Sequence, residues 1–169
     1  HYARGTALAR TQRTEDARRE LARIERLGAE PALERVRIKN INPAAALVRI
    51  AALTLSADIA LAEGRPADAI APLTQAVAIE DDLAYDEPHL WLAPTRHALG
   101  AALLAADRPA DAARVYREDL ARYPDNGWSL AGLASAERRR GNADAARAIE
   151  ARLRKAWVRA DVVLTGSRF

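Results

Sequence analysis

The chain contains no cysteine and no methionine, and only 5% of its 169 residues are aromatic. Without cysteine it has no disulfide framework, no thiolate nucleophile and no cysteine-ligated metal site. Charged side chains interrupt every apolar stretch before it reaches the roughly 18 residues of a membrane helix, so we expect no membrane span. Because a natural chain begins with methionine, we interpret His1 as an internal residue of a longer protein.

Alanine and arginine dominate what is present, and Lys39 and Lys155 are the only lysines. Half of the residues are hydrophobic and 29% are charged, which excludes a largely disordered chain. Alanine and arginine favour helices, and strand-forming residues are scarce, so the composition predicts an all-α fold. The net charge of +3 is too small to indicate nucleic acid binding by itself.

A short motif recurs four times, each time between two helix-like runs. Its copies are Arg13-Thr14-Glu15-Asp16-Ala17, Arg65-Pro66-Ala67-Asp68-Ala69, Arg108-Pro109-Ala110-Asp111-Ala112 and Asn142-Ala143-Asp144-Ala145-Ala146. The last two copies are 34 residues apart, and Leu99 and Leu133 share that offset. The earlier intervals of 43 and 52 residues predict insertions near 84–92 and within 32–49.

Each repeat unit is expected to form two helices. Between Thr95 and Ala106, apolar residues recur with helical spacing, and Pro109 suits the first turn of the following helix. Pro124 ends that helix. The predicted helices outside the first unit span 43–63, 66–82, 95–106, 109–123, 128–140 and 143–160. By the same alignment the chain starts inside a helix of the first unit.

These units resemble a tetratricopeptide repeat array. In the third unit the matching residues are Leu99, Gly100, Ala112, Tyr116 and Pro124. In the fourth they are Leu133, Ala134, Gly141 and Ala146, while Glu150 and Val158 depart from the pattern. The resemblance implies a right-handed α-solenoid of antiparallel helix pairs, with about four repeats and two insertions. One repeat domain then covers 1–169, with units at approximately 1–31, 44–83, 93–126 and 127–160 and a tail at 161–169.

Two further stretches, 85–88 and 159–169, look like the C-terminal region of large bacterial proteins of this family, which places Phe169 near a natural C-terminus. Members of that group often carry an N-terminal export signal. Because such a signal would lie upstream, the sequence leaves a cytoplasmic and an exported location equally open.

The resemblance also implies a binding face, which the first helix of each pair lines. By register the candidate partner-binding residues are Tyr2, Thr6, Arg10, Thr54, Asp58, His97, Trp128, Ser135, Arg138 and Arg139. Mixed polar and aromatic side chains suit an extended peptide or a partner helix. The face lacks the lysines and asparagines of a carboxylate clamp, so we do not expect one. A groove filled by 45–50 or by the tail 162–169 would argue against peptide binding.

No catalytic constellation, cofactor site or metal site is predicted. The insertion at 84–92 follows several carboxylates and contains His89, but they have no ligand spacing, and we expect Pro88 and Trp91 to be buried instead. Asp58 and His97 form the one conceivable acid–base pair, without a nucleophile. From Arg138 onward the sequence contains nine basic and three acidic residues. Helical repeats that read RNA place base-contacting polar residues at the same position of every repeat, and this sequence does not, so we disfavour nucleic acid as a partner.

We therefore expect a non-enzymatic scaffold that binds a protein or peptide on its concave face. One alternative is a structural role as the capping, C-terminal part of a larger repeat protein, packed on upstream repeats or in a homodimer. Another alternative is that this part of the chain forms the lid or wall of an enzyme whose active site lies upstream.

Overall fold

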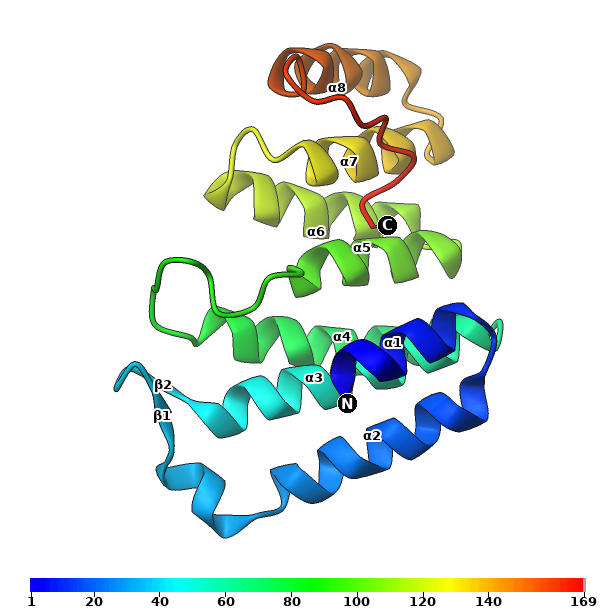
Figure 1. Ribbon diagram of the computed structural model, residues 1–169. Helices are drawn as coiled ribbons and strands as arrows, with labels where there is room; N and C mark the ends of the chain where they lie inside the picture. Colours follow the sequence, from blue (N-terminus) through cyan, green and yellow to red (C-terminus); the bar gives the residue numbers. More distant parts are fainter. Residues whose placement is uncertain (169) are drawn as a thin grey trace. The chain divides into compact units, whose positions relative to one another are not determined.

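The computed structural model describes residues 1–168 (Figure 1). These residues contain eight α-helices, one 3₁₀ helix and two short strands. They form two compact units, His1–Thr95 and Arg96–Phe169. Phe169, the last residue of the predicted tail, lies outside the described residues.

The first unit is built around one long apolar helix, α3. Its elements are α1 (Tyr2–Arg10), α2 (Thr14–Gly28), the 3₁₀ helix η1 (Pro31–Arg35), β1 (Arg37–Ile38), β2 (Asn42–Pro43), α3 (Ala44–Ala62) and α4 (Pro66–Asp81). Helix α3 packs against α1, α2 and α4. Leu8 of α1, Ile24 of α2 and Leu55 and Ile59 of α3 belong to one buried cluster.

By length and composition alone, α3 could cross a membrane. It is the one such helix among residues 1–168. Arg49 and Asp58 are the charged residues that interrupt its apolar run. Half of the apolar window is buried inside the fold, as in the core helix of a packed unit.

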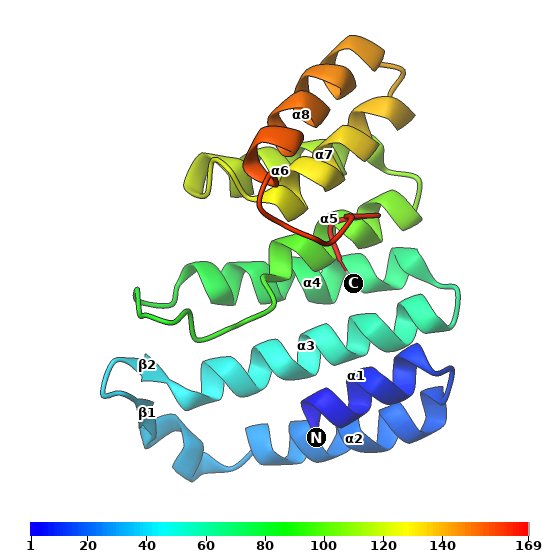
Figure 2. The same ribbon diagram turned by 45° about the horizontal axis from the view of Figure 1, so that its top comes forward.

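The second unit contains four helices. They are α5 (Thr95–Ala105), α6 (Pro109–Arg122), α7 (Gly127–Arg139) and α8 (Ala143–Ala156). Helix α7 packs against both α6 and α8. Figure 2 shows the residues after α8 as an irregular segment that returns towards α5.

Each helix pair turns through one residue in the left-handed region. These residues are Gln12, Gly64, Asp107 and Gly141, with φ between 55° and 80°. Glycine adopts this conformation without steric cost, whereas Gln12 and Asp107 hold it with a side chain present. Each copy of the sequence motif begins directly after one of these turns, at Arg13, Arg65, Arg108 or Asn142. The turns therefore recur at the same intervals as the motif.

Ion pairs explain why arginine and aspartate recur in the motif. Arg108 donates from Nε to Asp111 at 2.8 Å, and Arg13 bonds Asp16 over the same distance. Each acid lies in the first turn of its helix, where the positive end of the helix dipole favours a carboxylate. The motif therefore specifies a helix start.

Each unit also buries one glutamate among cations. Glu20 of α2 bonds His1 and Arg23, both at 2.6 Å. Glu137 of α7 accepts from Arg140 at 2.8 Å and from Asn142 at 2.6 Å. Burying an ionised carboxylate is costly unless several donors surround it, and both sites meet that condition.

The all-α prediction is confirmed, and so are the six helices predicted downstream of residue 42, most of them within two residues at each end. The exception is α8, which ends at Ala156 instead of 160. The first insertion contains η1 and a two-stranded antiparallel ladder, which pairs Arg37 with Pro43 and was not predicted. A strand of two residues is too short to show the alternating pattern from which strands are predicted.

Candidate functional site

The second unit contains a buried polar network that ties α5, α6 and α7 together. Asp119 accepts hydrogen bonds from Ser129 Oγ at 2.6 Å and from Asn126 Nδ2 at 3.0 Å. The same amide lies 2.9 Å from His97 Nε2, which is 3.5 Å from the Asp119 carboxylate. Asn126 also caps α7, because its Oδ1 accepts from Trp128 N.

This network orients side chains and does not assemble a nucleophile. The Ser129 hydroxyl donates its proton to Asp119, whereas a serine nucleophile would have to donate it to a histidine. Burial by itself would raise the pKa of Asp119, but the interactions with His97 and Ser129 outweigh it and lower that pKa. Asp119 therefore stays ionised, and it is the acid beside His97.

The side chain of Tyr116, on α6, lies between two glycines, one on α5 and one on α7. Its side chain is fully buried, and a Cβ added to Gly100 of α5 or to Gly132 of α7 would lie 2.3 Å from its Cζ atom. Both helices therefore need glycine at these positions. Burial raises the pKa of Tyr116 to about 12, so the hydroxyl remains protonated.

The segment after α8 lies on the hydroxyl of Tyr116. Val162 O accepts from Trp157 Nε1 at 2.7 Å, and the chain then runs across α7 to α5 in both views (Figure 1, Figure 2). Ser167 is only 4% exposed, with its Oγ 2.5 Å from Tyr116 Oη and 3.1 Å from His97 O. We call Tyr116 Oη and His97 O together the serine seat. Residues 162–168 therefore cover part of this face of the second unit.

In the first unit, the loop between α4 and α5 contacts the start of α1 through Trp91. Trp91 packs on Tyr2 with ring centroids 5.0 Å apart, and both rings contact the buried cluster. The Trp91 Nε1 and Thr6 Oγ1 atoms are buried without a hydrogen-bond partner among the described residues. The expectation that Trp91 packs against neighbouring helices is confirmed, whereas Pro88 is exposed, contrary to expectation.

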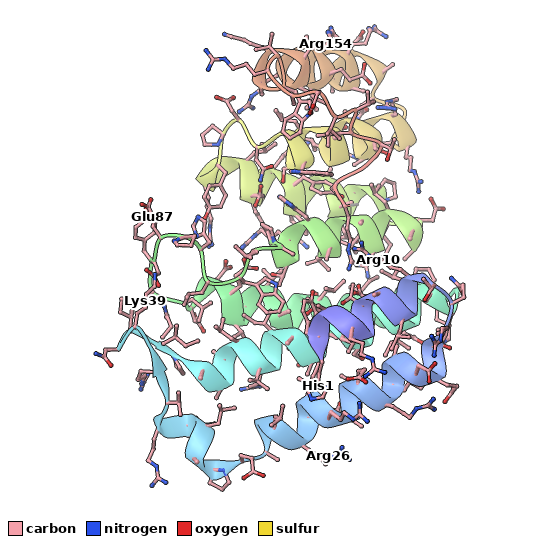
Figure 3. All side chains as sticks on the ribbon, viewed as in Figure 1. His1, Arg10, Arg26, Lys39, Glu87 and Arg154 are labelled. Carbon is pink, nitrogen blue, oxygen red and sulfur yellow. The ribbon has the colours of Figure 1, made fainter. Side chains whose placement is uncertain are left out.

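The strand ladder of the first insertion fastens this loop. Lys39 Nζ bonds Asp86 at 2.9 Å and the Glu87 carbonyl at 3.0 Å, at the corner labelled in Figure 3. The buried Asn42 side chain both donates to Ala84 O, at 2.9 Å, and accepts from Ala84 N, at 2.8 Å. Two insertions that lie far apart in the sequence therefore form one structure.

The acidic residues around this loop have structural partners. Glu80 accepts from the backbone N of Thr95 at 2.8 Å, at the start of α5, and Asp86 pairs with Lys39. Among residues 1–168 no group of three or more potential ligands is arranged to hold a metal ion.

The ten residues predicted to bind a partner fall into three groups. Thr54, Asp58 and His97 are buried, and Thr54 donates to Ile50 O at 2.5 Å within its own helix. Tyr2, Thr6, Trp128 and Ser135 are half-buried, and Trp128 packs edge-on against Trp157. Arg10, Arg138 and Arg139 are exposed.

The two exposed arginines of α7 also have partners within the second unit. Arg138 bonds Glu150 at 3.0 Å, and Arg139 donates to Leu104 O at 2.6 Å. Several other basic residues of the C-terminal stretch are likewise paired, which reduces the charge available to phosphates. These pairs are Arg140 with Glu137, Arg147 with Asp144 and Arg152 with Asp125.

Sequence reasoning missed the residues that shape the serine seat. Tyr116 and Gly100 were identified only as matches to the repeat pattern, and Gly132 and Ser167 were assigned no role. A usable signal exists, since two glycines on successive first helices flank an aromatic residue on the helix between them. The contact of Ser167 has no local signal, because it joins residues 70 positions apart.

Comparisons of the chain with protein-family models, with curated proteins and with solved structures find no match. The fold defines an all-helical protein in which successive helices pack on one another in a repeat-like order. The resemblance to tetratricopeptide repeats stays a prediction that rests on the sequence motifs.

Proposed function

We propose that this chain is a protein-interaction module of the tetratricopeptide repeat class, a right-handed solenoid that binds extended segments of a partner on the first helices of its pairs. Coverage by the tail would argue against peptide binding if the tail held this face permanently, and the observation that carries the proposal is that the segment 162–168 lies there as a peptide-like chain. It has no regular secondary structure, and it is held on α5 through a buried side chain, Ser167. A face that holds an irregular segment of its own chain has the chemistry to hold one from elsewhere.

The four left-handed turns support the repeat class. They recur at the junction of every helix pair and preserve the 34-residue interval between Asp107 and Gly141. Repeat proteins of stacked helix pairs use extended surfaces for recognition, because each pair contributes one helix to a shared face. Thr6 and Arg10 remain the contact candidates of the first unit, and Ser135 remains that of the second.

The test is a set of arginine substitutions in the full chain, with far-UV circular dichroism to check that each variant remains helical. Thr6→Arg and Ser135→Arg place a bulky cation on the proposed face, while Ala22→Arg and Ala148→Arg place it on exposed positions of α2 and α8. Proteins captured by the unmodified chain are identified and purified, and their affinity for each variant is measured. We expect at least a tenfold loss for the first two variants only. A partner that binds all four variants equally well would overturn the proposal.

A structural role is the second candidate, because the first unit exposes apolar side chains. Leu27 is 52% exposed, Val36 47% and Ile41 45%, which suits packing on upstream repeats or in a homodimer. The measurement is the mass in solution of the full chain and of Leu27→Asp. A dimer that dissociates in the variant would favour this role, and a monomeric full chain would exclude the homodimer.

A further inference from the structure

The hydrogen bonds at the serine seat have one consistent arrangement. Ser167 Oγ carries a single proton, which it donates to His97 O at 3.1 Å, so the Tyr116 hydroxyl must donate to Ser167 Oγ at 2.5 Å. The His97 carbonyl lies within α5 and also takes part in the helical hydrogen bonding, whereas the buried Tyr116 hydroxyl depends on a hydroxyl beside it for its acceptor. An alanine at this position would leave the buried Tyr116 hydroxyl without an acceptor among these groups.

The seat is rigid before anything binds to it. Gly100 and Gly132 fix the Tyr116 ring from two sides, since each would place a Cβ within 2.3 Å of it. The imidazole of His97 is held by Asn126, which in turn bonds Asp119, so this part of α5 is fixed as well. A rigid site loses little entropy when it binds, which favours recognition of a short segment.

Part of the occupant is exposed to solvent. Val162 and Val163 are 56% and 86% exposed, and Thr165 is exposed too, whereas Leu164, Gly166 and Arg168 are half-buried. Its anchors include the bond from Trp157 to Val162 and the two bonds of Ser167, and residues 162–168 form no helix or strand. Irregular segments open at a lower free-energy cost than packed helices, so residues 162–168 can leave the seat while the helices stay folded.

We propose that the serine seat is a peptide-binding site for extended segments that carry a serine, and that Ser167 is its built-in occupant, which a partner segment displaces. The inference rests on the proposed function and adds to it the chemistry of the ligand and a control by the chain itself.

A tethered occupant competes strongly with an external one. The linker from Ala156 to Ser167 is short, and short flexible linkers give effective concentrations on the order of millimolar. A free peptide at micromolar concentration therefore binds only when the tethered Ser167 is prevented from occupying the seat.

The experiment uses the full chain and a fluorescent peptide with the sequence of residues 161–169. The chain is compared with Ser167→Glu, which cannot place a neutral hydroxyl in the seat, and with Thr165→Glu, which makes the same change at an exposed position of the same segment. Fluorescence anisotropy is expected to show binding to Ser167→Glu that is at least tenfold tighter than to the other two chains. Far-UV circular dichroism checks that all three remain helical.

Two further arms test the hydroxyl itself. A peptide with alanine in place of the serine, and the double variant Ser167→Glu with Tyr116→Phe, should each weaken binding roughly tenfold. Failure of a folded Ser167→Glu chain to bind the peptide, equal binding by all chains, or equal binding of the alanine peptide would each overturn this inference. None of these results touches the proposed function, which depends on the arginine variants and on partners of any sequence.

Discussion

The two glycines around Tyr116 allow a quantitative test of the packing in the second unit. In Gly132→Ala the new Cβ would lie 2.3, 2.6 and 2.7 Å from the ring atoms Cζ, Cε1 and Cε2. Ordinary carbon contacts need at least about 3.5 Å, so the ring or the helix must move by about 1 Å. The ring cannot retreat, because Gly100 approaches it equally closely from α5.

Two opposing effects decide the sign of the stability change. Alanine is better than glycine inside a helix by about 1 kcal/mol, which would stabilise the variant. Overpacking a rigid core typically costs about 1–3 kcal/mol, and the lack of space on both sides of the ring places this site at the upper end. We therefore expect Gly132→Ala to lower the free energy of unfolding by about 1–2 kcal/mol.

The assay is chemical denaturation of the full chain, followed by circular dichroism and by tryptophan emission. A double-mutant cycle with Tyr116→Leu isolates the contact, because leucine lacks the ring atoms that clash. In that background Gly132→Ala should become neutral or stabilising. Gly28→Ala serves as the control, since its nearest neighbour, Val48 Cγ1, is at 3.4 Å. A stabilising Gly132→Ala in the unmodified background would refute the packing argument.

Three further predictions concern the turns, the buried acids and the loop. Asp107→Gly should raise the free energy of unfolding by about 1 kcal/mol, because φ at Asp107 is 55°. Gly64→Ala should lower the free energy of unfolding by a similar amount, and thermal melts of both variants would measure these changes. The folded-state pKa values of Asp119 and Glu137 are lowered, so their contribution is present above the unfolded values near 4 and is lost as pH falls through the folded ones. Acid titration of stability should therefore be less steep in Asp119→Asn, and an unchanged slope would contradict this. The emission of Trp91, obtained as the difference between the chain and Trp91→Phe, should lie at shorter wavelength than that of tryptophan in water, and an unshifted band would exclude its packing on Tyr2.

The helices could be predicted because their signals are local. Pro66 and Pro109 begin α4 and α6 as the first-turn preference of proline requires, and Gly64 and Gly141 occupy left-handed turns that favour glycine. Such signals act within a few residues, so one sequence suffices to detect them. The hairpin at Arg37–Pro43 escaped because its ladder is held by Asn42 and Lys39 contacts to a loop more than 40 residues away.

The candidate site was predictable only in outline. Register placed His97 and Thr54 on the partner face, but both side chains bond within the fold, since a polar group near a helix interface finds the nearest buried partner. Asn126 and Asp119 lie on other elements, and helical periodicity carries no information about which side chains meet between elements. Ser167 belongs to an irregular segment, for which no pattern predicts a position.

The return of residues 162–168 to α5 changes how the second unit should come apart. In a linear stack each helix contacts only its neighbours, so the last helix can fray alone and the energetics resemble a one-dimensional chain. Ser167 bonds His97 across 70 residues and so joins the end of this stack to its beginning. Complete unfolding of α8 then also breaks a contact on α5, so the first and the last helix of the unit are coupled and do not unfold independently. Because residues 162–168 can leave the seat, this coupling exists only while Ser167 is seated, and displacement of the segment returns the unit to a linear stack.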